Sequence, residues 1–258
     1  MNKNLIVLLT IFTITITANA QNLTGKEIAQ KVKDRPDGNT RTAEMKLTLI
    51  NKNGSRRDRK IRSYAMDIGK DTKQIMFFLY PGDVKGTGFL TFDYNAIGKP
   101  DDKWLYLPAM KKTRRISGKS SKTDYFMGTD FTYDDMGKRN VEEDSHTLLR
   151  EESRNEKKYW VLESIPQKGD DLYAKRISWI RQDCLIADKV EYYDKLGKLQ
   201  RIFTVKEIRQ INGIWSICKM EMENVQTSHK TEIILENQQY DITVNPQTFT
   251  IPRLERGL

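Results

Sequence analysis

Residues that commonly build catalytic or metal-binding sites are scarce in this sequence. Its 258 residues include only two cysteines and two histidines. Neither His146 nor His229 has a second histidine four residues away or a cysteine pair nearby, which is the spacing of a zinc site. We therefore predict no metal at either histidine and expect both to be structural or surface residues.

Catalytic motifs are also missing. No serine or cysteine lies in a nucleophile-elbow sequence, and no glycine-rich loop has the pattern of a phosphate-binding site. One segment is rich in aspartate but lacks the spacing and closing glutamate of a calcium loop, so we expect these side chains to cap a short helix and a turn. They are Asp124, Asp130, Asp134 and Asp135. The sequence gives no argument for an enzyme, a cofactor or a bound metal, and we expect none of the three.

The sequence also lacks an apolar run long enough to cross a membrane as a helix. Its longest such run, residues 5–18, contains several threonines and is shorter than the about 20 residues that a spanning helix needs. Lys3 precedes this run and Ala18-Asn19-Ala20 follows it, which is the layout of a secretory signal peptide. We expect residues 1–20 to be a signal peptide that is cleaved after Ala20, so that the protein is exported.

Acidic residues are outnumbered by basic ones, 35 to 44, and the formal net charge is +9. An exported basic protein is expected to meet anionic partners such as lipid headgroups, glycans or acidic protein faces. We expect no nucleic acid among them, since no nucleic-acid-binding signature is present. An oxidising compartment would permit a disulfide between Cys184 and Cys218, but two expected strands separate their elements, so we favour free, packed thiols.

Strand patterns dominate what is present. Residues 43–49 alternate apolar and polar side chains, and further strand-like segments, including one over residues 141–150, follow at spacings near a dozen residues. A helix is expected before them within residues 22–35, with Thr24 and Glu27 as its capping box. Roughly a dozen antiparallel strands are more than a flat open sheet usually holds, so we expect a curled sheet in one domain over residues 21–258.

The stretch from Ile75 to Met136 is dense in aromatic residues. In a curled sheet the inner face is both the core and the wall of a cavity, and ligand cavities are mostly apolar. The candidates for this wall are Met45, Leu47, Leu49, Phe77, Phe78, Phe89, Phe92, Trp104, Tyr106, Phe126 and Phe131. For any one of them, an ordinary core position is the simpler interpretation. Residues 118–137 and the N-terminal helix are expected to cover the cavity.

A basic hairpin lies beside this cover. Lys111, Lys112, Arg114 and Arg115 are candidates for docking on anionic headgroups or on an acidic protein face, because each basic residue near such a surface adds roughly 1 kcal/mol. The alternative, a solvated hairpin with no partner, fits the sequence equally well.

Several segments resemble the outer-membrane lipoprotein-sorting protein family, which is related to the LolA lipoprotein carrier. They are residues 78–90 (FLYPGDVKGTGFL), 104–109 (WLYLPA), 114–116 (RRI), 126–135 (FMGTDFTYDD), and Asn224-Val225-Gln226 ahead of His229-Lys230-Thr231. The resemblance implies a mainly β fold: an unclosed antiparallel β half-barrel around a hydrophobic cavity, with an N-terminal helix and a short helical lid.

The same resemblance implies a role as a periplasmic carrier. The carrier would bind acyl chains of lipoproteins or lipids and deliver them toward the outer membrane without a cofactor. We expect a monomer that contacts membranes transiently and meets an inner-membrane exporter or an outer-membrane acceptor. Two other binding roles stay open, a lipid-sensing regulatory protein and an accessory subunit of a resistance-nodulation-type lipid exporter, while a lipid hydrolase ranks last.

Overall fold

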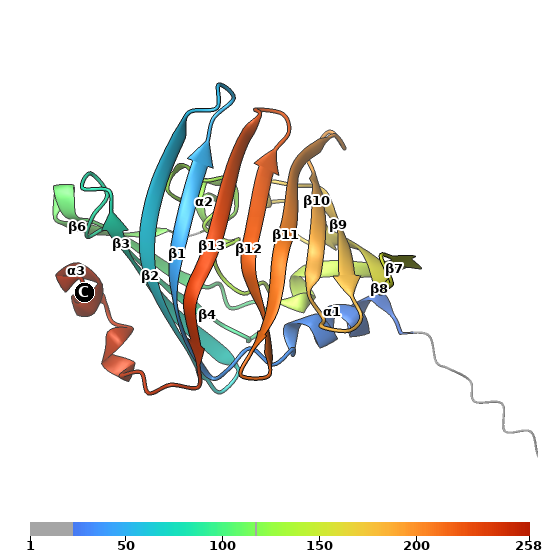
Figure 1. Ribbon diagram of the computed structural model, residues 1–258, viewed down its shortest axis with the longest axis horizontal. Helices are drawn as coiled ribbons and strands as arrows, with labels where there is room; N and C mark the ends of the chain where they lie inside the picture. The colour runs from blue at the N-terminus through green and yellow to red at the C-terminus, as the bar shows by residue number, and fades with distance from the viewer. Residues whose placement is uncertain (1–22, 117) are drawn as a thin grey trace, which may run out of the picture.

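Thirteen antiparallel strands form one continuous sheet (Figure 1). This computed structural model describes residues 23–116 and 118–258, and the expected signal peptide lies outside them. The strands are β1 (Thr40–Ile50), β2 (Arg56–Ile68), β3 (Asp71–Tyr80), β4 (Gly88–Asp93), β5 (Asp102–Leu107), β6 (Lys112–Ile116), β7 (Asp144–Arg154), β8 (Lys157–Pro166), β9 (Lys175–Arg181), β10 (Ala187–Tyr193), β11 (Leu199–Ile211), β12 (Ile214–Asn224) and β13 (His229–Tyr240). The prediction of a mainly β, unclosed antiparallel sheet is confirmed.

The order of the strands explains how the chain reaches the middle of the sheet. The order is β6-β5-β4-β3-β2-β1-β13-β12-β11-β10-β9-β8-β7, so the first and last strands pair at the centre. The chain runs outward from β1 to one edge and returns inward from the other edge. Residues 118–143, here called the crossing segment, must therefore pass from edge strand β6 to edge strand β7. They do so across one face, called the inner face, which lies behind the central strands in Figure 1.

Short helices lie at the two ends of the chain and along the crossing segment. They are α1 (Gly25–Lys33), α2 (Lys119–Thr123) and α3 (Ile251–Arg256), with single 3-10 turns η1 (Pro108–Met110), η2 (Phe126–Gly128), η3 (Val141–Glu143) and η4 (Pro246–Thr248). None of the helices in the described residues has the length and hydropathy that a membrane span requires.

Helix α1 begins as its sequence predicts. The Thr24 hydroxyl accepts the Glu27 N–H at 3.2 Å, and the Glu27 carboxylate accepts the Thr24 N–H at 2.7 Å, which completes the capping box. Ile28 is fully buried and packs with Val141, Leu162 and Ile180. The helix is thereby fixed over η3, β7 and β8, at one side of the inner face.

Side chains alternate between the two faces of each strand, and both faces are covered around β3, β4 and β5. The crossing segment covers the inner face. On the outer face, η4 and α3 bring Phe249 and Leu254 onto Ile75 and Leu90. The backbone of Gly88 makes this contact close, since a Cβ atom there would lie 2.5 Å from a Leu254 methyl carbon. The sequence pattern did not predict this C-terminal cover.

Two smaller outcomes concern β7 and the cysteines. The strand expected from residue 141 begins at Asp144, because Val141–Glu143 form η3. Cys184 and Cys218 are both buried and free, as expected.

Candidate functional site

Residues 126–135, here called the tip of the crossing segment, are part of the hydrophobic core. Phe126 is fully buried, and its ring centroid lies 5.1 Å from that of Phe89 and 5.9 Å from that of Phe78. Tyr133 packs edge-on against Phe126 at 5.5 Å. Such aromatic pairs add about 0.5–1.5 kcal/mol each beyond their area burial. The tip is therefore held firmly against the inner face.

Buried polar groups fix the same tip to the central strands. The Asp130 carboxylate accepts a hydrogen bond from the Thr231 hydroxyl at 2.7 Å and lies 2.7 Å from His229 Nδ1. Arg201, which is fully buried, donates through Nη1 to the Asp130 carbonyl at 2.9 Å and to Asp135 Oδ2 at 2.7 Å. His229 thus has a structural role, as its isolated position in the sequence predicts.

A chamber of about 480 Å³ lies between the crossing segment and the central strands. Its apolar lining comes from Met45, Met76, Phe131, Met136, Val190, Phe203, Met220, Met222, Ile233 and Leu235. Five of the nine methionines in the chain are in this lining. Methionine is unbranched and polarisable, so a wall rich in it adapts to flexible apolar ligands of varying shape.

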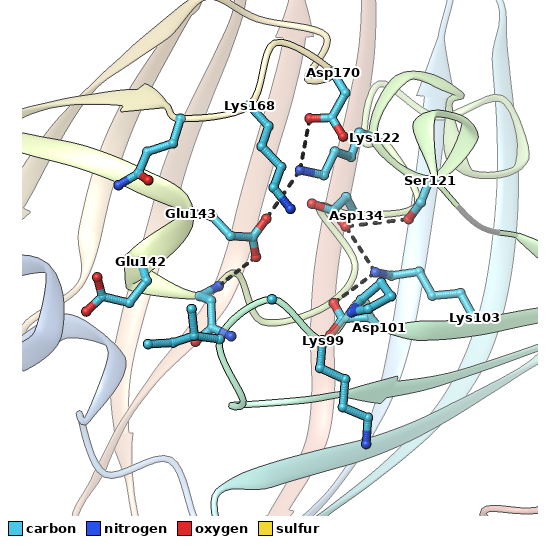
Figure 2. Close-up of a pocket in the computed structure, with 16 residues that line it drawn as sticks. Lys99, Asp101, Lys103, Ser121, Lys122, Asp134, Glu142, Glu143, Lys168 and Asp170 are labelled. Atoms are coloured by element: carbon cyan, nitrogen blue, oxygen red, sulfur yellow. Dashed lines mark hydrogen bonds and ion pairs between the residues drawn. The ribbon is translucent and has the colours of Figure 1, made fainter.

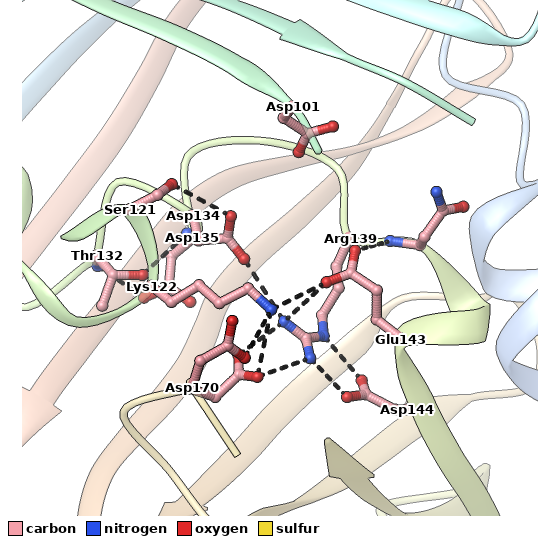
Figure 3. A network of polar contacts seen from close by, with 12 residues as sticks. Asp101, Ser121, Lys122, Thr132, Asp134, Asp135, Arg139, Glu143, Asp144 and Asp170 are labelled. Carbon is pink, nitrogen blue, oxygen red and sulfur yellow. Dashed lines mark hydrogen bonds and ion pairs between the residues drawn. The ribbon is translucent and has the colours of Figure 1, made fainter. Parts of the chain in front are cut away.

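The opposite side of the chamber is charged (Figure 3). Arg139 donates to Asp144 Oδ1 at 2.7 Å and to Asp171 Oδ1 at 2.8 Å, and Arg176 donates to Asp144 Oδ2 at 2.6 Å. Burial alone would raise the pKa of Asp144, but the hydrogen bond from Arg139 and the charge of Arg176 outweigh it, and the pKa lies below its usual range. The chamber therefore has one apolar wall and one charged wall, here called the ionic wall.

A second pocket of about 460 Å³ adjoins the ionic wall and is lined mainly by polar and charged groups (Figure 2). Lys122 and Asp134 line both spaces and separate them. Lys103 is almost fully buried beside this partition and donates to Asp134 at 3.0 Å and to Asp101 at 3.1 Å. Nearby, burial and the charge of Asp101 raise the pKa of Asp93 to about 7.

The structure brings part of the predicted cavity wall together. Met45, Leu47, Leu49, Phe78, Phe89, Phe126 and Phe131 all belong to the inner core, and of these Met45 and Phe131 line the chamber itself. The remaining candidates, Phe77, Phe92, Trp104 and Tyr106, lie on the outer face and pack in the cluster that contains Phe249 and Leu254. These four do not face the chamber.

The reason is the two-residue period of a strand. Phe77 and Phe78 are neighbours on β3, so their side chains must point to opposite faces. The same holds for Phe89 and Phe92, which are three residues apart on β4. Alternation could also have found Met220 and Met222, which share the inner face of β12. No strand pattern predicts the ionic wall, because its residues come from four places in the chain. These are the crossing segment, β7, the β8–β9 connection and β9.

All four predicted docking residues are exposed on the β5–β6 hairpin. Arg115 differs from Lys111, Lys112 and Arg114 in that it forms an ion pair, with Asp102. In the β5–β6 ladder, Lys112 lies opposite Leu107 at the turn, and Lys103 lies opposite Ile116 at the other end. Lys103 lines the polar pocket, so the basic tip and the polar pocket lie at opposite ends of this hairpin. Docking at the tip would leave the pocket open.

Comparison with known proteins identifies the family. A family model described only as an uncharacterized protein matches residues 70–256. A Vibrio parahaemolyticus domain, named for outer membrane lipoprotein sorting, has 33% sequence identity and a TM-score of 0.83, and the match covers 90% of this chain and 98% of that one. The chain belongs to the outer-membrane lipoprotein-sorting protein family. The resemblance in the sequence is thereby confirmed.

Two further solved structures are similar. A DUF1329 family protein from Desulfovibrio piger has 29% identity and a TM-score of 0.84, with 89% of this chain and 97% of that chain covered. A LolA superfamily protein from Nitrosomonas europaea has 17% identity and a TM-score of 0.70, with 90% and 99% covered, and it shares the fold. No curated protein matches the chain.

Proposed function

We propose that this protein is a periplasmic carrier, which binds acyl chains of lipoproteins or lipids in the chamber and delivers them toward the outer membrane. The observation that carries the proposal is the methionine-rich wall of the chamber, in a chain of the lipoprotein-sorting family. The chamber's volume of about 480 Å³ is within the range of small-molecule sites, roughly 300–1,000 Å³. Each methylene that leaves water for such a wall contributes about 0.8 kcal/mol, so a long chain binds without a catalytic group.

Cargo entry would involve the ends of the crossing segment rather than its tip. The tip is held by Arg201 and by the tilted and edge-on ring contacts around Phe126. Lys122, within α2 near the start of the crossing segment, contacts Glu143, Asp170 and Asp171 at 3.3–3.4 Å. These distances exceed the roughly 2.7–2.9 Å of strong charged hydrogen bonds, so this side opens at lower cost. Helix α1 stays in place in this mechanism, since Ile28 is locked over β8.

The basic tip Lys111, Lys112 and Arg114 would direct docking. It would bring the carrier to anionic headgroups of a membrane, where an inner-membrane exporter hands over cargo or an outer-membrane acceptor receives it. Cargo release would follow that contact.

The direct test is native extraction of the protein followed by mass spectrometry of bound lipid. Purified protein should also bind a fluorescent fatty acid. Met220→Glu places a carboxylate in the apolar wall and should lower probe affinity at least tenfold, because an unpaired charge there loses its hydration.

The matched control is Met110→Glu, at a methionine that is 65% exposed and away from the chamber. It should bind the probe as the wild type does, and thermal melting should confirm that both variants fold. Protein that carries no lipid and binds no acyl probe would exclude the carrier function.

A further inference from the structure

The polar pocket beside the chamber has a pattern of charge that acyl-chain binding does not explain. The two spaces share Lys122 and Asp134, so a ligand in the chamber lies one side chain away from the pocket. The chamber accepts apolar chains, whereas the pocket presents ammonium and carboxylate groups (Figure 2). A molecule with long chains and a polar end would occupy both.

Carboxylates exceed cations along the partition. Five of them, Asp101, Asp134, Glu143, Asp170 and Asp171, share three cations, Lys103, Lys122 and Arg139. Arg139 is further engaged by Asp144. Burial, followed by the charge of Asp101, raises the pKa of the adjacent Asp93 to about 7. The partition therefore favours an added positive group, and an ammonium offers three N–H donors to the carboxylates.

Two lysines of the pocket, Lys99 and Lys168, form no ion pair among the described residues, and the Lys99 ammonium lies 3.3 Å from the centroid of the Tyr94 ring. Lys168 points into the space, and within residues 23–116 and 118–258 it forms no ion pair, although it lies in the same pocket as Glu143 and Asp170. A lysine ammonium that is not neutralised by a carboxylate is suited to a phosphate oxygen. The pocket thus combines a spare positive charge from the β8–β9 connection with a surplus of negative charge along the partition.

We propose that this pocket binds the head group of a phospholipid that carries both a phosphate and a primary ammonium, while its acyl chains lie in the chamber. The phosphate contacts Lys168, and the ammonium contacts the carboxylates around Lys122. This inference rests on the proposed carrier function and adds the class of cargo to it.

The test compares lipids with identical acyl chains as competitors of the fluorescent fatty acid. Phosphatidylethanolamine should displace the probe at a concentration roughly fivefold lower than that needed for phosphatidylglycerol or diacylglycerol. A fivefold gain in affinity is about what one exposed ion pair contributes. Phosphatidylcholine, whose ammonium has no N–H, should also compete less well. Equal competition by all four lipids, or a preference for phosphatidylglycerol, would overturn the head-group site but leave the carrier function standing. Absence of probe binding would instead reject the carrier function.

Two substitutions locate the site. Lys168→Gln should weaken phosphatidylethanolamine roughly fivefold without changing the affinity for diacylglycerol. Asp170→Asn should reduce the preference for phosphatidylethanolamine over phosphatidylcholine. The control Lys158→Gln removes a lysine that is also exposed, on β8 and outside both spaces, and should change neither value. If Lys168→Gln behaves like Lys158→Gln, Lys168 does not bind the phosphate and the proposal fails.

Discussion

Asp93, the last residue of β4, is a buried carboxylate that makes stability depend on pH. Its Oδ1 has no hydrogen-bond partner among the described residues, and burial followed by the charge of Asp101 raises its pKa to about 7. The folded protein therefore holds this proton more tightly than the unfolded chain. The stabilising contribution of Asp93 is full below about pH 4 and is lost as the pH rises through about 7. Relative to the wild type, Asp93→Asn should gain on the order of 3–4 kcal/mol in unfolding free energy between these limits.

Urea unfolding at several pH values measures this difference. Asparagine can still accept the hydrogen bond from the Lys138 N–H, so the comparison isolates the charge. Asp83→Asn, at an exposed position in the β3–β4 connection, serves as the control and should keep the pH profile of the wild type. Identical profiles for Asp93→Asn and wild type would mean that Asp93 is ionised at no cost.

The sequence predicts the place of some of these side chains in the fold but not of others. Composition identified the apolar inner wall, and Met45 and Phe131 do line the chamber. Aromatic density alone misplaced Phe77 and Trp104, because a list of apolar residues ignores which face of a strand each one occupies. Asp93 gave no signal in the sequence, since its buried environment is created by residues that only the fold brings near it.

Among the elements, the crossing segment depends on a buried ion pair. Burial would raise the pKa of Asp135, but Arg201 at 2.7 Å outweighs this effect and the pKa is lowered. Arg201→Met leaves Asp135 as an uncompensated charge beneath the sheet. We expect a loss of about 3–5 kcal/mol in unfolding free energy at neutral pH.

The partner substitution separates this charge effect from lost packing. Adding Asp135→Asn to Arg201→Met should restore part of the stability, and a double-mutant cycle from urea unfolding gives the coupling between the two residues. Because the pKa of Asp135 is lowered, its stabilising contribution in the wild type is present above about pH 4 and is lost in acid. The unfolding free energies of the wild type and Arg201→Met should therefore become more alike as the pH falls. Equal damage from the single and double variants would show that packing, not charge, is what Arg201 provides.

Elements with a strong period were predictable, and elements fixed by distant contacts were not. Alternation and turn sequences predicted the strands, and the capping box predicted the start of α1. Helix α3 spans only six residues, too few for a helical period to appear, and it is held by Leu254 on Gly88. The tip of the crossing segment is likewise set by Thr231 and Arg201, which lie far along the chain.

At the scale of the whole molecule, the chamber follows from the topology. Pairing of β1 with β13 places both ends of the meander at the centre and leaves β6 and β7 as opposite edges. The connection between these edges must then cover the inner face, and any space it does not fill becomes a cavity. The resemblance to the lipoprotein-sorting family predicted this architecture, whereas strand patterns alone predicted only a curled sheet.

The net charge of +9 is spread over the whole chain, so a docking site must be separated from general attraction to anionic surfaces. The triple substitution of Lys111, Lys112 and Arg114 by glutamine removes the tip of the β5–β6 hairpin as a positive site. The control replaces Lys52, Lys70 and Lys198, exposed lysines of three other turns, by glutamine and has the same net charge. At low salt, sedimentation with vesicles containing phosphatidylglycerol should show a loss of roughly a hundredfold in vesicle affinity for the hairpin variant and a much smaller loss for the control. The gap should narrow near physiological ionic strength, where screening acts within about 8 Å. Equal losses in the two variants would mean that binding follows overall charge, and the basic hairpin would then have no docking role.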